Sequence, residues 1–508
     1  MLVKINSAAV LGMEAYIVEV EVDKAKGLPG QSIVGLPDTA VKESRDRIRA
    51  ALKNSGFDFP PGYLTINLAP ADIKKEGPVY DLAIAIGILA ASGQIELTLL
   101  KSTVILGELS LDGSVRLVSG VLPIMLTLKE KGLQRILLPE ENKDEAALIE
   151  EIEVIPIRNL KETVDFLNKK SSIQPYKIDV EALFLKEQVF DFDFSEVKGQ
   201  DRAKRALEIA ACGGHNVLMV GPPGSGKTML ARRIPSIMPC LSKLEALELT
   251  KIYSVAGMLA SNRSLVFHRP FRSPHHTTSS IGIIGGGRVP RPGEVSLAHH
   301  GVLFLDEFPE FDRSVVEVLR QPLEDNKVTI SRALISLTYP AEFILILAMN
   351  PCPCGHYLDS QKQCSCSPGK IQRYWEKLSG PLLDRIDIQL EVARLKTEEL
   401  SQKKEAEDSK SVRERVEFAR EIQRHRFKNS GVSCNGRMRP KQLKEFCVLE
   451  DTAEELLKAA ILKLRLSGRA YDRILKVSRT IADLDGKEQI ASSHIAEAIQ
   501  YRSLDRVS

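Results

Sequence analysis

The residues best suited to chemistry lie in the run NVLMVGPPGSGKTMLARRI, which begins at residue 216. A β-branched segment leads into Gly221-Pro222-Pro223-Gly224-Ser225-Gly226-Lys227-Thr228, and a helical pattern follows. Such glycines let backbone N–H groups wrap phosphates at the N-terminus of a helix. Lys227 would reach the β- and γ-phosphates, and the Thr228 hydroxyl would bind Mg²⁺. The run therefore predicts a P-loop that binds ATP and Mg²⁺.

Side chains that could complete this site follow two further apolar runs. In HHGVLFLDEFPEF, Asp306 and Glu307 come directly after the apolar residues, where strands of an α/β sheet present their ligands. Asp306 suits the support of the metal, and Glu307 suits the base that polarises the attacking water. In AEFILILAMN, the last residue is Asn350, whose amide could hold that water against the γ-phosphate.

Three arginines could contact phosphates from other parts of the chain. Arg385, in SGPLLDRIDIQLEV, could act as a finger on the nucleotide of a neighbouring subunit. An ordinary salt bridge to Asp384 or Asp387 is the alternative. Arg469 and Arg473 lie one helical turn apart in LSGRAYDRIL, and one of them would close on the phosphates from a helical lid.

Half of the eight cysteines stand together, directly after Asn350, in the order Cys-x-Cys, nine residues, Cys-x-Cys. Four thiolates in two close pairs can complete a closed tetrahedral Zn²⁺ site, although the usual spacing has two residues between the members of a pair. The pattern predicts a structural zinc, with His356 as a substitute ligand and four unliganded thiols as the alternative. The predicted ligands are Cys352, Cys354, Cys364 and Cys366.

The elements that must position these residues fall into several regions. At 508 residues the chain is expected to form two or three domains. Residues 1–168 mix β-type and helical runs, and 169–195 have the polar composition of a linker. In 196–395, which contains the cysteine loop 352–366, apolar strands alternate with helices, a pattern typical of a parallel α/β sheet. A charged linker at 396–411 precedes a helical region at 412–508.

The bulk composition of the chain excludes few classes of function. Lys and Arg total 70 against 67 Asp and Glu, a net charge of +3, so any nucleic-acid surface must come from local clustering. The start of the chain lacks the pattern of a signal peptide, and the most apolar run, DLAIAIGILAASG, is too short to span a membrane. We expect a cytoplasmic protein with reduced thiols and no membrane partner.

Longer stretches resemble a known family. RPFRSPHHTTSSIGIIGGGRVPRPGEVSLAHHGVLFLDEFPEF and SGPLLDRIDI are similar to the magnesium-chelatase-like ComM/YifB family of AAA+ ATPases, and the similarity covers nearly the whole chain. The resemblance implies a parallel-sheet ATPase core with a helix-2 insert, a helical lid, and a hexameric ring that drives branch migration on DNA, single-stranded or branched, in recombination and natural transformation. The matching positions are Lys227 and Thr228 (Walker A), Asp306 and Glu307 (Walker B), Asn350 (sensor 1), Arg385 (arginine finger) and Arg469 (sensor 2), with Arg473 as the alternative.

The spacing supports an insert independently. About 75 residues separate Thr228 from the acidic pair, much more than a βαβ crossover needs. Two stretches read as hairpins that would line the pore of a ring, SIGIIGGGRVPRPGE and NKVTISRALISLTYPAEF. Their cations would contact the phosphates of DNA, or are merely solvated turn charges. These cations are Arg288, Arg291, Lys327 and Arg332.

The N-terminal region resembles a different fold. TINLAPADIKKEGPVYDLAIAIGIL and GELSLDGSVRLVSGVLPIM are similar to the Lon-type protease fold. A protease would need a serine after Gly77-Pro78 and a lysine after Gly120, but the chain has Val79 and Ile124 there. Neither side chain can be a nucleophile or a base. We therefore expect a Lon-protease-like α+β domain without the catalytic dyad.

Two functions remain open on the sequence. The first is an ATP-driven DNA motor, and the second is a chelatase-like or protein-remodelling ATPase that acts on a protein partner. Residues 412–444 contain ten Lys or Arg against three Asp or Glu. Such a stretch suits a DNA-facing patch, although a solvated helix face is the usual explanation.

Overall fold

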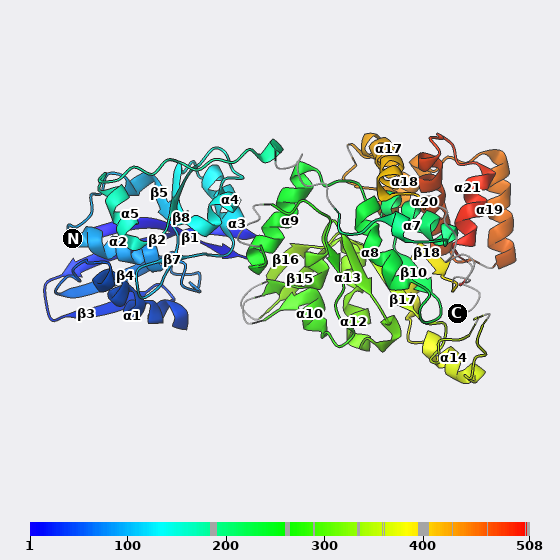
Figure 1. The fold of residues 1–508 in the computed structure, drawn as a ribbon, viewed down its shortest axis with the longest axis horizontal. Coiled ribbons are helices and arrows are strands. Elements are labelled where there is room, and N and C mark those ends of the chain that lie inside the picture. The colour runs from blue at the N-terminus through cyan, green and yellow to red at the C-terminus, as the bar shows by residue number, and fades with distance from the viewer. Residues whose placement is uncertain are drawn as a thin grey trace. The chain divides into compact units, whose positions relative to one another are not determined.

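The chain forms two compact units in a computed structural model (Figure 1). Unit 1 comprises Met1–Glu187 and Ala246–Phe267, and unit 2 comprises Gln188–Glu245 and His268–Ser508. The structure describes all residues except 183–189, 260–264, 288–289, 333–335, 358, 360, 395–405, 429, 465, 503 and 505–508.

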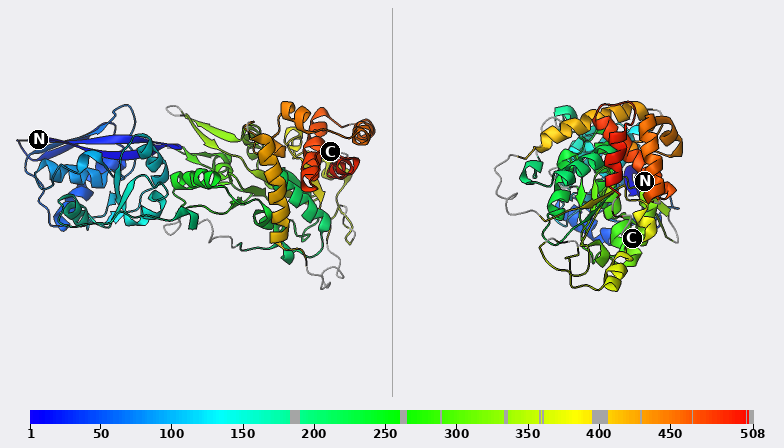
Figure 2. Two further views of the ribbon diagram at one scale, coloured as in Figure 1. Left: turned by 90° about the horizontal axis from the view of Figure 1, so that it is seen from above. Right: turned by 90° about the vertical axis from the view of Figure 1, so that its right-hand side faces the viewer.

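Unit 1 is built on a seven-stranded mixed sheet in the order β3-β4-β2-β1-β5-β8-β9. The antiparallel β1–β2 pair is its longest ribbon, drawn in dark blue in Figure 2. The strands are β1 (Leu2–Leu11), β2 (Glu14–Ala25), β3 (Gly30–Val34), β4 (Tyr63–Ala69), β5 (Thr103–Ile105), β8 (Arg135–Pro139) and β9 (Glu153–Ile157), with a separate pair β6 (Glu108–Leu109) and β7 (Val115–Arg116). The helices are α1 (Thr39–Asn54), α2 (Asp81–Ala91), α3 (Val121–Glu130), α4 (Lys143–Ala146) and α5 (Leu160–Leu167).

Helix α2 explains the most apolar run of the sequence. All of its residues are buried, and it packs on β1 and β2. Gly87 allows this close approach, because a Cβ there would lie 2.6 Å from a methyl carbon of Val22. The run is therefore a core helix of a globular unit. In the described part of the chain, no helix is both long and apolar enough to cross a bilayer.

The positions that a Lon-type protease would use are apolar in the structure too. Val79 is half-buried and packs against the core of unit 1, and Ile124 is buried on α3.

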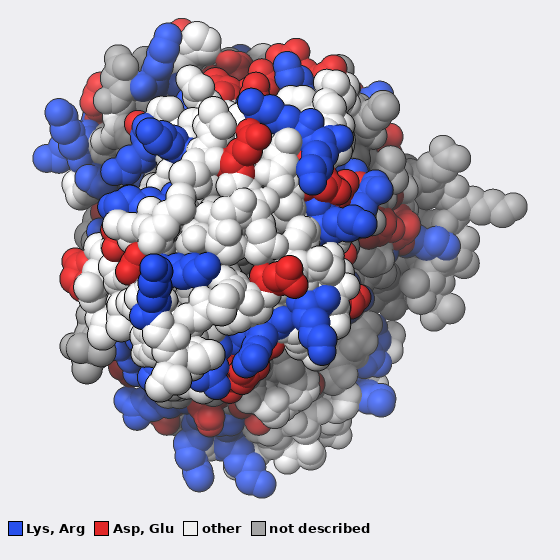
Figure 3. Space-filling view, turned by 90° about the vertical axis from the view of Figure 1, so that its left-hand side faces the viewer, with Lys and Arg blue, Asp and Glu red and all other residues white. Residues whose placement is uncertain are grey.

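The face drawn in Figure 3 carries acidic and basic side chains interspersed around a mainly uncharged centre. The described residues on that face form no continuous basic track of the kind that follows a phosphate backbone.

A segment expected in the ATPase core belongs instead to unit 1. Helix α9 (Lys243–Ala256) continues into this unit from residue 246 onward, where Leu249 and Ile252 are buried. Near its end, the Ser254 hydroxyl donates to the Glu145 carboxylate, which also accepts a bond of 2.7 Å from the Leu122 N–H. The chain between the P-loop and the acidic pair therefore includes an excursion into the first unit.

The predicted linker at 169–195 is also not a free connection. Tyr176 bonds to Val154 of β9 through its backbone N–H, at 2.8 Å, and to Asp144 through its hydroxyl, at 2.6 Å. The boundary between the two units falls after residue 187. Most of the charged linker predicted at 396–411 lies outside the described residues.

Unit 2 is built on a five-stranded, all-parallel sheet in the order β11-β14-β17-β10-β18. Its strands are β11 (Phe271–Arg272), β14 (Val302–Leu305), β17 (Ile344–Met349), β10 (Val217–Val220) and β18 (Ile388–Glu391). Because the strands are parallel, all of their carboxyl ends lie at one edge of the sheet and all of their amino ends at the other. The apolar runs read from the sequence are these buried strands.

Helices surround this sheet and form the C-terminal region. Those of the core are α7 (Asp201–Gly213), α8 (Lys227–Ile237), α10 (Ser280–Ile284), α11 (Glu294–Leu297), α12 (Arg313–Val318), α13 (Arg320–Asp325), α14 (Pro368–Trp375) and α15 (Gly380–Leu383). Those of the C-terminal region are α17 (Ser409–Phe427), α18 (Pro440–Phe446), α19 (Asp451–Leu464), α20 (Gly468–Leu484) and α21 (Ser492–Gln500). The described residues from 406 onward contain no strand beyond one isolated bridge, as the helical periods indicated.

Both predicted hairpins are present. β12 (Gly285–Gly286) pairs antiparallel with β13 (Arg291–Pro292), directly after α10. β15 (Lys327–Ser331) pairs antiparallel with β16 (Ser336–Pro340), and this longer hairpin extends away from the five-stranded sheet (Figures 1 and 2). The first hairpin is shorter than the sequence suggested, because a helical turn takes up residues 280–284.

Candidate functional site

The P-loop joins β10 to α8 at the carboxyl edge of the parallel sheet. Lys227 is buried, and its ammonium donates to the carbonyl oxygens of Gly221, at 2.7 Å, and Pro222, at 3.1 Å. Burial lowers the pKa of Lys227, while the carboxylates of Asp306 and Glu307 oppose that shift. A buried ammonium that has only neutral oxygens as hydrogen-bond partners gains from an anion, which is the situation that a phosphate would meet.

The acidic pair follows β14 at the same edge. The Thr228 hydroxyl donates to the Asp306 carboxylate at 2.6 Å, so the two predicted Mg²⁺ ligands are neighbours. Glu307 adopts a left-handed backbone conformation, with φ of 50°, and its side chain is 60% exposed. Oxygen ligands of this kind suit Mg²⁺, and an exposed carboxylate beside them can accept a proton from water.

Asn350 lies at the end of β17, next to β10 in the sheet. Its side-chain oxygen accepts a bond of 3.3 Å from the Lys227 ammonium. Lys227, Thr228, Asp306, Glu307 and Asn350 thus come together at one edge, although they stand on three strands that are distant in sequence. The arrangement can bind a nucleoside triphosphate and hold water beside a carboxylate.

A cavity of about 460 Å³ opens beside Glu307 and Asn350. Three basic side chains of α14 and the residues that follow it, Lys370, Arg373 and Lys377, line its other side. Trp375 holds this helix in place, because its buried indole N–H donates to the carbonyl oxygen of Pro351 at 3.0 Å. Sequence reasoning missed these cations, since a short basic helix gives no signal of what it faces.

The arginines predicted to contact phosphates lie at the opposite edge of the sheet. Arg385 precedes β18, and its backbone carbonyl accepts a bond of 3.0 Å from the Asn216 side chain. Asn216 directly precedes β10, whereas the P-loop directly follows it. A four-residue strand spans about 13 Å, so Arg385 is separated by the width of the sheet from the P-loop of its own chain.

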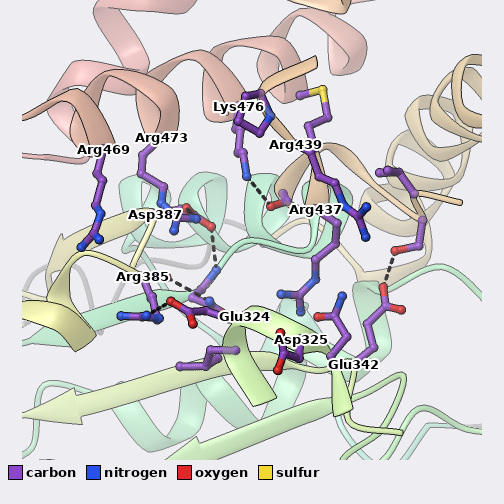
Figure 4. Close-up of a pocket in the computed structure, with 18 of the residues that line it drawn as sticks. Glu324, Asp325, Glu342, Arg385, Asp387, Arg437, Arg439, Arg469, Arg473 and Lys476 are labelled. Carbon is purple, nitrogen blue, oxygen red and sulfur yellow. Dashed lines mark hydrogen bonds and ion pairs between the residues drawn. The ribbon is translucent and has the colours of Figure 1, made fainter. Parts of the chain in front are cut away.

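Arg469 and Arg473 join Arg385 and do not approach the P-loop of the same chain. Both side chains descend from α20 toward Arg385 (Figure 4). Arg469 pairs with Asp384 at 2.6 Å, and Arg473 pairs with the buried Asp387 at 2.7 Å. The neighbouring cations lower the pKa of Asp387 far below its usual range despite its burial. Helix α20 therefore brings both sensor candidates close to Arg385.

The alternative partners proposed for Arg385 from the sequence are wrong. Asp384 and Asp387 pair with the two lid arginines, and Arg385 pairs with Glu324 at the end of α13. The sequence could not indicate Glu324, which lies 61 positions away in the chain. This cluster lines a cavity of about 550 Å³ (Figure 4).

The four cysteines of the loop gather their sulfur atoms in one place. The Sγ atom of Cys352 lies 3.3 Å from that of Cys354 and 3.7 Å from that of Cys364, and the latter two are 3.6 Å apart. The sulfur of Cys366 lies within 4.8 Å of the others. Four sulfurs bound to one Zn²⁺ at about 2.3 Å would lie about 3.8 Å apart, which these separations approach.

Backbone N–H groups also point at these sulfurs. The Tyr357 N–H donates to Cys352 Sγ at 3.3 Å, and the Cys366 N–H donates to Cys364 Sγ at 3.4 Å. Thiolate sulfur accepts bonds of this kind, and the thiolate is the form that binds metal. His356 is not among the described residues that gather at this cluster, and its Nδ1 lies 3.1 Å from the carboxylate of Asp359.

The cysteine loop lies against the P-loop. A Cβ at Gly355, where φ is +84°, would come within 2.7 Å of the Pro223 ring. Arg394 adds a second link, since it donates to the Pro223 carbonyl at 3.2 Å and lies 3.7 Å from the Asp359 carboxylate. The loop thus packs against the P-loop from outside.

The predicted DNA contacts lie in different places. Arg291 is exposed on β13, and Arg332 is exposed at the end of the described part of the β15 arm. Lys327 is at the base of that hairpin and lines the Arg385 cavity. Arg288 lies outside the described residues. The rings of the adjacent His275 and His276 are tilted, with their centroids 4.1 Å apart, and His276 lies 3.5 Å from the Glu307 carboxylate.

Much of the basic stretch 412–444 is engaged within unit 2. Arg415 pairs with Glu208 at 2.7 Å and with Glu407, Arg426 pairs with Asp483 at 2.7 Å, and Arg424 pairs with Glu417 at 3.2 Å. Arg413 donates to the Ser236 carbonyl at 2.9 Å. The stretch therefore stabilises the fold, and its charge count is weak support for a DNA surface.

Comparison with known proteins gives consistent matches along the chain. Three family models match: magnesium chelatase, subunit ChlI, at residues 193–400; subunit ChlI of Mg-chelatase, at residues 20–142; and the C-terminal model of magnesium chelatase subunit ChlI, at residues 406–502. The competence protein ComM of Haemophilus influenzae is 44% identical over 514 residues, covering 99% of this chain and 98% of that protein. YifB of Escherichia coli is 43% identical over 505 residues, covering 99% and 97%. A magnesium-chelatase 67 kDa subunit of Chlorobaculum parvum is 28% identical over 162 residues, covering 31% and 23%.

The geometry at the carboxyl edge separates binding from chemistry. Glu307→Gln should still bind ATP but hydrolyse it at least about a hundredfold more slowly, because the water loses the carboxylate that takes its proton. Lys227→Ala should weaken binding itself. Titration with a fluorescent ATP analogue and an assay of phosphate release distinguish the two effects. Glu376→Gln, an exposed change at the end of α14, is the control, and wild-type hydrolysis by Glu307→Gln would refute the assigned role.

Proposed function

The chain belongs to the ComM/YifB family of magnesium-chelatase-like AAA+ ATPases, and on that basis we propose that it is an ATP-driven motor that moves DNA as a ring of identical subunits. The substrate would be single-stranded or branched DNA, and the activity branch migration in recombination. Supporting this, one relative is named a competence protein. The two hairpins supply a place where an ATPase ring could grip a phosphate backbone.

One observation carries the proposal of a ring. The phosphate-binding groups of unit 2 lie at the carboxyl edge of its sheet, and Arg385 lies at the amino edge, with the lid arginines beside it. A single chain therefore has both halves of a hydrolysis site but cannot join them. A second copy, placed with its amino edge on the first copy's carboxyl edge, would complete the site. Such a head-to-tail contact closes into a ring, which the family resemblance implies has six members.

Within the site, the residues of one chain would share the work as follows. Lys227 binds the β- and γ-phosphates in place of the loop carbonyls that it now contacts. Glu307 accepts the proton of the attacking water, which Asn350 orients. Thr228 and Asp306 would hold Mg²⁺, which neutralises charge on the phosphate oxygens when bound. Arg385 of the neighbour stabilises the charge on the transferred phosphoryl group.

The alternative, a chelatase-like or protein-remodelling ATPase, is favoured by a different observation. Several arginines of residues 412–444 are paired within the chain, which removes much of the support that this stretch gave to DNA binding. The rate of ATP hydrolysis with single-stranded, duplex and branched DNA separates the two functions. A motor on DNA should be stimulated severalfold by at least one of them. No stimulation by any would favour a protein substrate.

The shared site makes a second prediction. Arg385→Ala subunits keep their Glu307, and Glu307→Gln subunits keep their Arg385, so each variant alone should be nearly inactive. In an equal mixture, about a quarter of the interfaces would combine an intact base with an intact finger. The hydrolysis rate of the mixture should rise accordingly above that of either variant. A mixture no more active than its components would show that the finger works within its own subunit.

We also propose that the four loop cysteines hold a structural Zn²⁺. The sulfur separations and the N–H groups that point at them support this site, and four thiolates leave no open position for catalysis. The bound metal would fix the loop that lies on Pro223 of the P-loop. Four unliganded thiols remain the alternative.

Elemental analysis of protein purified without chelator should find about one zinc per chain. Cys364→Ser should lose the metal and increase proteolysis within 352–366, with only modest global destabilisation, because the surrounding sheet has its own core. Cys240→Ser, a change at an exposed cysteine outside the cluster, should keep the metal. Metal content near zero, with all four thiols freely titratable, would end the zinc proposal.

A further inference from the structure

Arg385 is held by a carboxylate of its own chain. Glu324 pairs with the Arg385 guanidinium from the end of α13 (Figure 4). The Glu324 side chain is 59% exposed, whereas that of Arg385 is 13% exposed. An exposed carboxylate is the kind of partner that an incoming anion can replace, because the released carboxylate is readily solvated.

The surroundings of Arg385 favour such a replacement. Of the described residues that line the cavity, seven are Lys or Arg and five are Asp or Glu, so the cavity has an excess of positive charge. Arg469 and Arg473 face Arg385 across it (Figure 4). Burial lowers the pKa of Arg385, and the neighbouring arginines lower it further. Its Nε atom is buried and has no hydrogen-bond partner among the described residues. A phosphate with several negative oxygens would relieve this repulsion better than one carboxylate.

Glu324 is tied to the hairpin that the proposed function assigns to DNA. Two residues after it, Asn326 ends α13 in a left-handed conformation, with φ of 54°. Strand β15 then begins at Lys327. The Asn326 carbonyl accepts a bond of 2.8 Å from the Ala341 N–H and so closes the base of the β15–β16 hairpin. Any displacement of Glu324 is therefore transmitted to the hairpin base within a few residues.

The two legs of this hairpin are anchored differently. The β16 leg leads into β17 of the sheet, and Arg437 donates to the Phe343 carbonyl at 2.7 Å. The β15 leg is attached to α13, where Glu324 binds Arg385. A change at Arg385 would therefore act first on the β15 leg, and the paired strands would tilt together about the point where the β16 leg joins the sheet.

Both hairpins would move together. The buried Tyr339 of β16 donates to the Pro290 carbonyl at 2.7 Å, next to β13. Ile330 of β15 lies against Gly285, where an added Cβ would come within 2.9 Å of its Cδ1 atom. The shorter hairpin therefore packs on the longer one, and a tilt of the longer hairpin carries it along.

We propose that Glu324 couples the nucleotide of a neighbouring subunit to the hairpins: Arg385 exchanges the Glu324 carboxylate for the neighbour's γ-phosphate, and the released α13–β15 segment tilts. This inference rests on the proposed shared ATP site. Glu324 is a positioning residue in this scheme, since it acts through Arg385. In the absence of ATP in the neighbour, Arg385 returns to Glu324 and the hairpins return with it.

The test compares the full-length protein with Glu324→Gln, which keeps the size of the side chain but removes its charge. Hydrogen–deuterium exchange of residues 327–340 is measured with ADP and with a non-hydrolysable ATP analogue. In the wild type, exchange of the hairpin should differ between the two nucleotides. In Glu324→Gln this difference should disappear. ATP hydrolysis without DNA should rise about two- to fivefold, because the finger no longer has to leave an ion pair.

Two further variants control for structure. Glu317→Gln removes a carboxylate of α12 that pairs with Arg320 at 3.4 Å and does not contact Arg385, so it should behave as the wild type. Glu324→Asp keeps the charge and should keep the nucleotide-dependent difference. The inference would be overturned if Glu324→Gln showed the same nucleotide-dependent difference in hydrogen–deuterium exchange as the wild type. It would also be overturned if the wild type showed no such difference.

The exchange measurement needs no DNA, so its outcome is separate from that of the proposed function. The hairpins could respond to nucleotide through Glu324 while no DNA stimulates ATP hydrolysis. That result would support the inference and refute the DNA motor. If DNA stimulates the wild type, the stimulation should fall toward onefold in Glu324→Gln. Undiminished stimulation in that variant would also overturn the inference.

Discussion

The strands of the five-stranded sheet all run in one direction, and the consequences of this polarity extend through unit 2. Loops that follow the strands gather at one edge, and residues that precede the strands gather at the other. Lys227 and Asp306 therefore meet at the carboxyl edge, while Arg385 and Asp387 meet at the amino edge. Flexibility of a side chain cannot bridge the width of a sheet. The polarity of the sheet is thus the physical reason why the proposed ATP site needs residues from two copies of the chain.

Each edge carries charge that the fold only partly neutralises. At the carboxyl edge, the Lys227 ammonium is buried among neutral oxygens, and basic residues of α14 line the cavity beside Glu307. At the amino edge, Arg385 pairs with Glu324, and no other cation of the described residues pairs with that carboxylate. Arg469 pairs with Asp384, and Arg473 pairs with Asp387. A triphosphate between two such edges would meet cations on both sides. Repulsion between these cations would disfavour bringing the edges together without nucleotide, and their attraction to the triphosphate would favour it with nucleotide present.

The segments outside the sheet act mainly by fixing these edges. The cysteine loop rests on Pro223 of the P-loop, and Trp375 secures α14 through the carbonyl of Pro351. The basic helix α17 forms ion pairs with α7 and α20, so that its charge stabilises packing. In unit 1, apolar side chains occupy the positions where a protease would have its dyad, Val79 and Ile124. Chemistry in this chain is thus concentrated in unit 2.

The sequence alone determined the features that depend on neighbours in the chain. The P-loop, the acidic pair, Asn350 and the spacing of the cysteines are local patterns, because each follows an apolar strand whose direction fixes where the next side chains emerge. Both hairpins were predictable as well, because turn residues flanked by strand patterns are also local signals. The tertiary structure decided what depends on distant partners. Arg385 is paired with Glu324, Arg469 and Arg473 lie beside Arg385, and residues 246–267 pack with unit 1. Sequence periodicity indicates which face of a helix is buried, but it does not indicate which element packs on that face. An ion pair produces no sequence pattern around either of its two residues.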